Sequence, residues 1–435
     1  MLGGGGSPAP LPEILLEWCA LVIIVAVAWL DRDQAPWPRM ALTFAAGLLL
    51  LPALQLVPLP PALWRNLPGR EMEAAALALI GAEGRWMPWS VSPPRTLAAL
   101  HALTVPAIAV VLAARASPNG RRLALAAVLS MALVSIAVGA AQLAGGPHSP
   151  LRFYASSHVE NLTGFQANRN AQADVLLIAL LALAALLAAL PASVRRRRAG
   201  LAASAALVLA TGVLLTASRT GIALLALGLM TLFVWQGGKV LAHAGRLRAV
   251  AVGAAVLVGA AVLAWAMTEN LALGRIAARF ANGDETRPEL WQDTLHAIGH
   301  YWPAGSGIGT FVPVFFAAER LEFVDPSIPN RAHNDFLELA LEAGLPGLML
   351  LAALGGVLVW RIVVTLRRSE TSERRAQTGF AAGVLALLAT HSLVDYPLRS
   401  MALATLAGVA SGMILAPTGR QGRRTRPERG ESNPT

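Results

Sequence analysis

The sequence lacks the groups from which soluble proteins build disulfides, thiolate metal sites and charged surfaces. Cys19 is the single cysteine among 435 residues and lies within an apolar run, so it has no partner for a disulfide or a thiolate metal site. Only 14% of the residues are charged, whereas 55% are hydrophobic, and the mean hydropathy is +0.56. These values exclude a soluble globular domain and predict a polytopic, all-α membrane protein.

Long apolar runs are the main feature of the sequence. A helix needs roughly 17 to 25 mostly apolar residues to cross a hydrocarbon core of about 30 Å. The runs predict eleven transmembrane helices, at 13–30, 40–57, 96–114, 122–144, 171–191, 199–218, 220–236, 248–267, 345–366, 377–395 and 400–416. The segment 71–81 is too short and too acidic to cross alone, so we expect a surface or re-entrant helix there, with a twelfth span as the alternative.

The positions of the basic residues predict the orientation of the chain. A net charge of +10 and a pI near 11.2 are compatible with nucleic-acid binding. Most Lys and Arg residues, however, lie in alternate short loops and in the C-terminal tail, and the positive-inside rule assigns those segments to the cytoplasm. The opposite, periplasmic face then carries the N-terminus and the loops near 58–95, 145–170 and 268–336, and we expect no nucleic-acid partner.

This orientation divides the chain into four predicted regions. They are an N-terminal membrane domain of about eight spans (1–267), a large periplasmic loop carrying amphipathic helices (268–336), about three C-terminal membrane helices (337–416) and a disordered basic cytoplasmic tail (417–435). The N-terminus lacks the basic n-region of a cleavable signal, so we expect the first span to remain as an anchor.

An isolated arginine marks a predicted turn on the periplasmic face. Residues 199–236 are mostly apolar with basic clusters at both ends, and Arg219 is the only charge inside this segment. Two helices that turn at 218–221 keep both basic ends in the cytoplasm and deliver Arg219 to the opposite surface. The alternative is a snorkelling arginine that only marks the turn.

The long loop contains a predicted amphipathic helix. Pro288 suits a first helical turn, and an apolar face follows it, made of Leu290, Trp291, Thr294, Leu295 and Ile298. We expect this helix to lie on the membrane with Arg287 at its start, although Arg287 can also be an ordinary solvated charge. The acidic residues Asp284, Glu285, Glu289 and Asp293 fit a solvated helix face better than a cation site.

Closely spaced glycines follow in the segment 303–311. No strand precedes them, which excludes a dinucleotide-binding motif, so we expect a sharp turn or a close approach to another segment. Further along, Asp335 and Glu338 resemble a capping box and predict a helix start. The segment 344–347 is predicted to break or kink this helix.

His333 then lies just outside a helix N-terminus. The positive end of the helix disfavours imidazolium and keeps His333 neutral and available as a base. The alternative is a histidine that only forms hydrogen bonds within its loop. Similarly, Asn168 or Asn170 can simply cap the helix that follows them.

Arginines, a neutral histidine and asparagines on one membrane face suit glycosyl transfer from a lipid diphosphate. Arg219 and Arg287 can hold a diphosphate leaving group without a metal. His333 can accept the proton of a hydroxyl group that attacks the anomeric carbon. We add Asn168, Arg169, Asn170, Arg331 and Asn334 as candidate substrate-binding residues.

The order and placement of these motifs resemble the O-antigen ligase and O-antigen polymerase superfamily of bacterial inner-membrane glycosyltransferases, over about residues 168–396. The motifs are Gly164-Phe165 with Asn168-Arg169-Asn170; Ser218-Arg219-Thr220-Gly221; Arg287 with Leu290-Trp291; Pro303 with Gly305, Gly307 and Phe311; and His333-Asn334-Asp335-Phe336-Leu337-Glu338 followed by Gly344 and Gly347. The resemblance implies transfer of a glycan from undecaprenyl diphosphate to a hydroxyl acceptor in the periplasm, with inversion and without a metal or other cofactor. It implies that Arg219 and Arg287 bind diphosphate and that His333 is the catalytic base.

The acceptor is left open by the sequence. Lipid A core and a growing polysaccharide both fit, and a protein O-oligosaccharyltransferase of the same superfamily is an alternative. A transporter of polysaccharide or lipid-linked sugar would also have many spans. Transporters commonly show internal repeats and ionisable groups at the bilayer midplane, however, and neither is evident here. A structural membrane subunit of a polysaccharide export complex is a further possibility.

Overall fold

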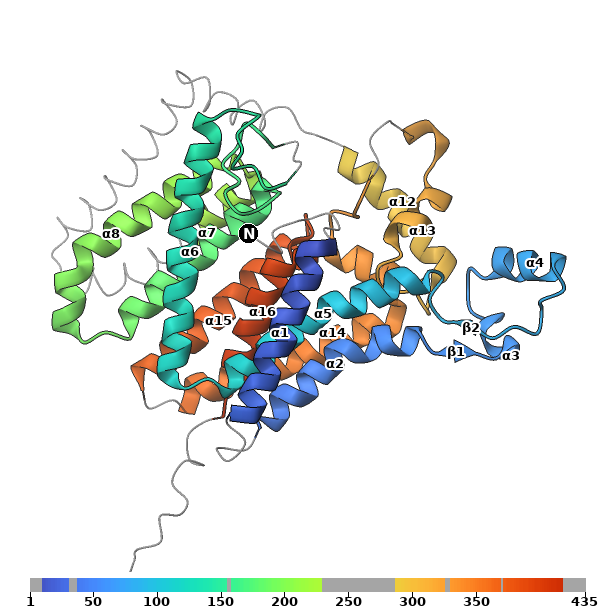
Figure 1. The fold of residues 1–435 in the computed structure, drawn as a ribbon, viewed down its shortest axis with the longest axis horizontal. Coiled ribbons are helices and arrows are strands. Elements are labelled where there is room, and N and C mark those ends of the chain that lie inside the picture. The colour runs from blue at the N-terminus through green and yellow to red at the C-terminus, as the bar shows by residue number, and fades with distance from the viewer. Residues whose placement is uncertain are drawn as a thin grey trace, which may run out of the picture.

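The computed structural model describes residues 10–30, 37–154, 158–228, 286–324, 329–368 and 371–417 (Figure 1). These residues are mostly helical, and a short antiparallel pair joins β1 (Pro58–Leu59) to β2 (Met87–Pro88). The α-helices up to residue 228 are α1 (Pro10–Leu30), α2 (Arg39–Gln55), α3 (Pro61–Trp64), α4 (Glu71–Leu79), α5 (Pro93–Arg115), α6 (Pro118–Ala144), α7 (Arg169–Ala188), α8 (Ala192–Leu215) and the helix Arg219–Gly228. The later elements are α12 (Thr286–Tyr301), α13 (Phe311–Ala318), the 3₁₀ helix η1 (Leu321–Phe323), α14 (Asp335–Arg368), α15 (Ser372–His391), the 3₁₀ helix η2 (Pro397–Arg399) and α16 (Met401–Leu415).

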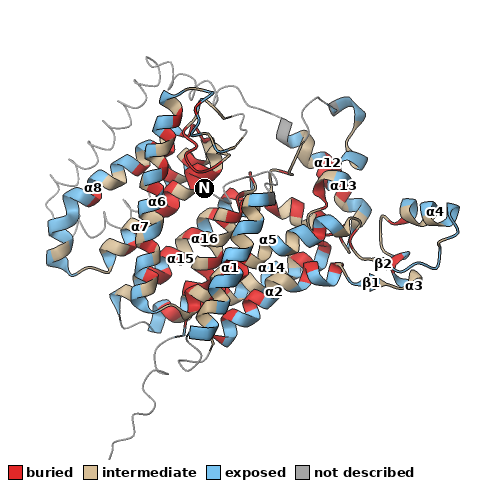
Figure 2. Ribbon diagram, viewed as in Figure 1, coloured by how far each residue is buried: buried red, intermediate tan, exposed pale blue. Residues whose placement is uncertain are grey.

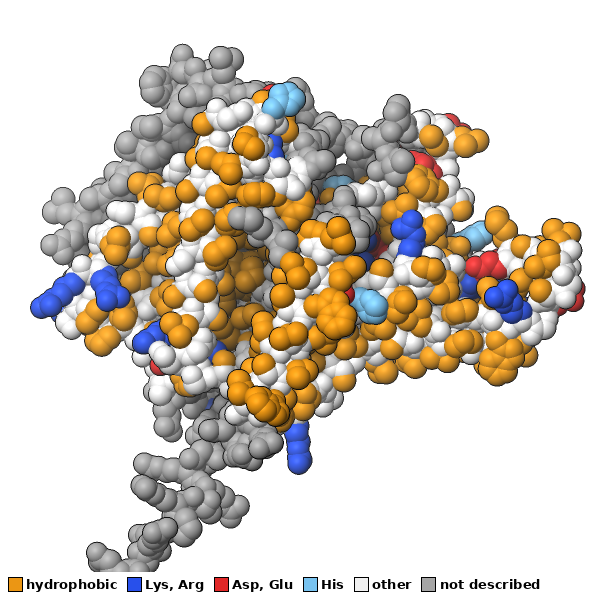
Figure 3. All heavy atoms as spheres, in the orientation of Figure 1, with side chains coloured by type: hydrophobic (Ala, Val, Ile, Leu, Met, Phe, Trp, Pro, Cys, Tyr) orange, Lys and Arg blue, Asp and Glu red, His pale blue; other side chains and the backbone are white. Residues whose placement is uncertain are grey.

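The predicted class of helical membrane protein is confirmed. Six helices among the described residues are long and apolar enough to cross a membrane: α1, α5, α6, α7, α8 and α14. Hydrophobic side chains also cover much of the face seen in Figure 3, as expected for a surface in contact with lipid. The count of eleven spans, the domain boundaries and the sidedness stay predictions. The predicted span 248–267 and almost all of the predicted tail lie outside the described residues, and the predicted span 220–236 is described only to residue 228.

Small residues let the central helices pack closely. A Cβ atom on Gly408 of α16 would lie 2.5 Å from the carbonyl oxygen of Pro106 in α5, and one on Gly412 would lie 2.2 Å from that of Val110. Such backbone contact is typical of helix packing in membranes. In Figure 2, α4 stands apart from the body of the protein, and no residue of this helix is buried. The expected short helix near 71–81 is therefore confirmed, although its position relative to the membrane stays a prediction.

The predicted break in the apolar segment near Arg219 is confirmed, but the turn is at residues 216–218 rather than 218–221. Helix α8 ends at Leu215 and the next helix begins at Arg219. The Oγ of Ser218 accepts a hydrogen bond from the N–H of Gly221 at 3.1 Å. A Cβ on Gly221 would lie 2.6 Å from the Cβ of Ala173, so this turn packs against the first turns of α7.

The predicted apolar face of α12 is wrong in part. Leu295 is 54% exposed, whereas Asp293 on the same helix is buried. Asp293 can be buried because its Oδ1 accepts a hydrogen bond from Nε of Arg320 at 2.5 Å, which compensates its charge. Helix α12 packs against α13 and α14 through a face rotated from the predicted one.

Helix α14 is broken where the sequence predicts it. Gly344 has a φ of 55° and a ψ of −151°, and the freed N–H of Leu345 donates to the carbonyl oxygen of Pro303 at 2.9 Å. A Cβ on Gly305 would lie 2.6 Å from the backbone nitrogen of Gly344. The expected close approach of the glycine-rich loop 303–309 to another segment is confirmed, and the break in α14 is what it approaches.

Candidate functional site

His333 lies in a loop that is held on both sides. Its neighbour Ala332 accepts a hydrogen bond at its carbonyl oxygen from Nε1 of Trp291 at 3.0 Å and donates its N–H to Oε2 of Glu338 at 3.1 Å. His333 has a φ of 49°, a backbone conformation that is uncommon for residues other than glycine. Its side chain is 30% exposed, and the ring meets the ring of Tyr396 edge-on at 4.8 Å between centroids. The loop therefore presents the imidazole to solvent in a fixed orientation.

The helix after this loop begins at the predicted place, but the capping residue is Asn334 and not Asp335. Oδ1 of Asn334 accepts hydrogen bonds from the N–H groups of Phe336 and Leu337 at 3.0 and 3.1 Å. Asp335 is unavailable as a cap because it is buried and its Oδ2 accepts from Oγ of Ser392 at 2.7 Å. The predicted substrate-binding residue Asn334 also donates from Nδ2 to the carbonyl oxygen of Leu393 at 2.9 Å. Its side chain thus anchors the His333 loop.

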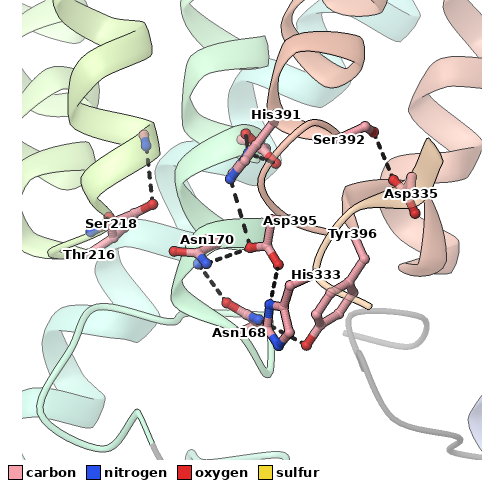
Figure 4. A network of polar contacts seen from close by, with 12 residues as sticks. Asn168, Asn170, Thr216, Ser218, His333, Asp335, His391, Ser392, Asp395 and Tyr396 are labelled. Atoms are coloured by element: carbon pink, nitrogen blue, oxygen red, sulfur yellow. Dashed lines mark hydrogen bonds and ion pairs between the residues drawn. The ribbon is translucent and has the colours of Figure 1, made fainter. Parts of the chain in front are cut away.

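Asp395 orients the imidazole of His333. Nδ1 of His333 lies 3.0 Å from Oδ1 of Asp395, so the ring donates its Nδ1 proton to the carboxylate and keeps a lone pair on Nε2 (Figure 4). Oδ2 of Asp395 accepts from Nδ2 of Asn170 at 2.5 Å. Burial would raise the pKa of Asp395, but the hydrogen bonds and charges of its partners hold that pKa below its usual value. The carboxylate of Asp395 is therefore ionised.

The two asparagines at the start of α7 both serve this arrangement. Asn168 is the helix cap, as predicted for one of the two, because its Oδ1 accepts from the N–H of Asn170 at 2.7 Å. Its Nδ2 lies 3.5 Å from the hydroxyl oxygen of Tyr396. Arg169 points elsewhere, with Nη1 3.4 Å from Oδ1 of Asn161. The structure thus brings Asn168 and Asn170 to His333 and directs Arg169 to the preceding loop.

A buried ionic cluster lies behind the His333 loop. Nη1 of Arg331 pairs with Oε1 of Glu338 at 2.9 Å, and Arg399 reaches Glu342 at 2.9 Å, Glu338 at 3.3 Å and Asp335 at 3.6 Å. Burial alone would lower the pKa of Arg399, but the three carboxylates raise it above its usual value. Arg331 thus compensates a buried carboxylate, and its predicted role in substrate binding stays a prediction. The cluster fixes the loop and the start of α14 against η2.

The two predicted diphosphate-binding arginines differ in how far the structure locates them. Arg219 is the first residue of its helix, its side chain is half-buried, and the described part of the chain offers it no hydrogen-bond or ion-pair partner. Its turn packs against Ala173, one helical turn from Asn170. Arg287 belongs to the first turn of α12, but its side chain lies outside the described residues. The described residues contain no group of three or more His, Cys, Asp or Glu side chains that could hold a metal ion.

Sequence reasoning missed Asp395 and Arg399. Both belong to the polar segment 395–399, which lies between two apolar runs. Ionisable residues beside membrane helices are a functional signal in themselves, and this segment carried that signal. The predicted span 377–395 includes Asp395, whereas α15 ends at His391.

Comparison with known proteins agrees with the motifs. Residues 204–352 match the family model described as O-antigen ligase. The match covers about a third of the chain and includes Arg219, α12, the glycine-rich loop and His333. A search of curated proteins finds no match. The resemblance to the O-antigen ligase and polymerase superfamily is therefore confirmed.

Proposed function

We propose that this protein is a membrane glycosyltransferase that moves a glycan from undecaprenyl diphosphate to a hydroxyl group of a carbohydrate acceptor. The acceptor is lipid A core or a growing polysaccharide. The reaction takes place on the periplasmic face of a bacterial inner membrane, and the C-terminus is cytoplasmic. The observation that carries the proposal is the contact of 3.0 Å between His333 and Asp395, which leaves Nε2 of a partly exposed imidazole available as a base.

The proposed reaction is a direct displacement. The acceptor oxygen attacks the anomeric carbon while its proton passes to Nε2 of His333, and the electron pair of the breaking C–O bond leaves with the diphosphate. Asp395 stabilises the imidazolium formed in this step, and the proton then returns to solvent or to the leaving group. General base catalysis of this kind contributes about 10²- to 10⁴-fold to the rate. Attack opposite the leaving group inverts the anomeric configuration, and no step needs a metal ion.

Arg219 and Arg287 complete the proposal by binding the diphosphate. A guanidinium stays charged at any working pH and matches phosphate oxygens with two hydrogen bonds. Arg219 starts a helix, and the dipole at a helix N-terminus also favours an anion. The packing of this turn against Ala173 supports a location close to the asparagines of α7.

Reconstitution tests the function and names the acceptor. The purified protein in proteoliposomes receives an undecaprenyl diphosphate glycan together with lipid A core, a second lipid-linked glycan or a pilin-like peptide in separate reactions. We expect one of the two carbohydrate acceptors to gain the mass of the glycan. A gain by the peptide alone would instead identify a protein O-oligosaccharyltransferase. Movement of labelled lipid-linked glycan across the membrane without a new glycosidic bond would identify a transporter.

A further inference from the structure

A second histidine–aspartate pair lies behind the first and has no part in the reaction described above. His391, the last residue of α15, and Asp174 of α7 have side chains that are 1% and 0% exposed. Nδ1 of His391 lies 2.7 Å from Oδ1 and 2.8 Å from Oδ2 of Asp174, so its proton is shared by both carboxylate oxygens. This pair is a strong polar link between two membrane helices.

The second pair is in line with the first. Nε2 of His391 lies 3.8 Å from Oδ2 of Asp395, and the carbonyl oxygen of His391 accepts the N–H of Asp395 at 2.9 Å. Figure 4 shows the resulting row, which runs from His391 through Asp395 to His333. Acidic and imidazole groups therefore alternate from Asp174 in α7 to His333 at the exposed end.

The space between the two carboxylates suits a water molecule. A cavity of about 10 Å³ lies there, close to the volume that one water needs. The residues that line it include Asn168, Asn170, Asp174, Asp395 and Tyr396. Asp174 of the second pair and Asp395 of the first therefore border the same cavity.

Packing alone does not explain the second pair, His391 and Asp174, which is the inner pair of the row. Burial of an ionisable pair costs several kcal/mol for each ion, and apolar residues of similar volume are often at least as stabilising. The neighbouring residue Ser392 connects the end of α15 to α14, because its hydroxyl group donates a hydrogen bond to Oδ2 of Asp335 at 2.7 Å. His391 and Ser392 thus tie the turn that carries Asp395 to α7 on one side and to α14 on the other.

We propose that His391, held by Asp174, is a positioning residue that fixes the carboxylate of Asp395 and through it the orientation of His333. The proposal rests on the proposed glycosyl transfer, in which His333 is the base. The charged and titratable groups that face Asp395 are Asp174 from α7, His391 from α15, Tyr396 beside it and His333 from the loop before α14. An amide in place of the Asp174 carboxylate holds His391 through one oxygen instead of two, so Asp395 is fixed less firmly and stabilises imidazolium at His333 less well.

Two conservative variants test the pair by kinetics. Asp174→Asn keeps an oxygen that accepts the Nδ1 proton of His391 but removes the charge, and His391→Gln removes the ring. We expect each to lower kcat of the folded protein by about 10- to 100-fold, the range typical of residues that orient a metal-binding histidine, with little change in KM. His101→Gln on the exposed surface of α5 is the matched control and keeps wild-type kcat. Wild-type kcat in both variants would overturn the proposal.

A second measurement needs no substrate and separates this proposal from the function. Diethyl pyrocarbonate acylates unprotonated imidazole, so its rate of reaction with His333 at different pH values, followed by peptide mass spectrometry, gives a midpoint for that residue. We expect Asp174→Asn to move this midpoint to lower pH and His101→Gln to leave it unchanged. If the wild type transfers no glycan, the proposed function fails and the midpoint still tests the coupling. An unchanged midpoint in Asp174→Asn, with only the yield of folded protein reduced, would mean that the pair is merely structural.

Discussion

The substitution Asp395→Asn tests the role of the carboxylate without a change in size. In the protein both oxygens of Asp395 are acceptors, one from Nδ1 of His333 at 3.0 Å and the other from Nδ2 of Asn170 at 2.5 Å. An asparagine side chain has only one acceptor oxygen. If its amide group faces Asn170, two donors meet. If the amide faces His333, the ring must move its proton to Nε2, and the lone pair that accepts the substrate proton is lost.

The size of the effect follows from this tautomer change. The same substitution in a Ser-His-Asp triad lowers kcat by about 10⁴-fold for the same reason. General base catalysis as a whole contributes about 10² to 10⁴. We therefore expect Asp395→Asn to lower kcat by about 10³- to 10⁴-fold, which corresponds to about 4 to 5.5 kcal/mol in the activation free energy.

The assay is the initial rate of glycan transfer at saturating donor, normalised to folded protein. Asp293→Asn is the matched control, because Asp293 is also a buried, ion-paired aspartate but lies on α12 and pairs with Arg320. We expect this control to retain most of the activity. An Asp395→Asn protein that keeps kcat within tenfold of the wild type would refute the orienting role of the carboxylate.

Three further predictions concern the charged groups. Arg399→Gln leaves three buried carboxylates without their shared counter-charge, so it should lower the free energy of unfolding by about 3 to 5 kcal/mol. The exposed Arg367→Gln should stay within about 0.5 kcal/mol of the wild type in the same unfolding experiment, and equal stabilities of the two variants would contradict the stabilising role of Arg399 in the cluster. Arg219→Ala should reduce the rate of glycan transfer by about 10²- to 10³-fold, as the loss of one oxyanion-binding donor does. The exposed Arg195→Ala should keep the wild-type rate, and an Arg219→Ala protein that also keeps it would exclude a role of Arg219 in diphosphate binding. The pKa of Asp395 is lowered in the folded state, so its contribution to stability should be fully present above about pH 4 and lost as the pH falls further. Melting temperatures of Asp395→Asn should therefore depend less on acid pH than those of the wild type, and an identical dependence would contradict the lowered pKa.

Local patterns in the sequence were sufficient to predict the turns and breaks between several helices. Apolar length and the basic ends of the segment 199–236 located the turn at Arg219, because both are properties of consecutive residues. The glycines of the loop 303–309 likewise predicted a close backbone approach, since each glycine leaves room where a side chain would be. The break at Gly344 followed from the adjacent proline and glycines.

Long-range contacts determined what the sequence could not predict. Asp395 is 62 residues from His333, and nothing in the spacing of either residue indicates the pairing. Asp335 has the right type and position for a cap, but its hydrogen bond to Ser392 leaves the cap to Asn334. Leu295 is exposed because the ion pair of Arg320 lets Asp293 take the buried side of α12.

The most direct test of the central claim is the rate of glycan transfer by the purified His333→Ala protein. Wild type and variant are reconstituted at equal amounts of folded protein with an undecaprenyl diphosphate glycan and the carbohydrate acceptor that the wild type uses. If His333 is the base, the variant inserts and folds but forms new glycosidic bonds at least about 10²-fold more slowly than the wild type. A variant that transfers glycan at the wild-type rate would contradict the assignment of His333 as the base.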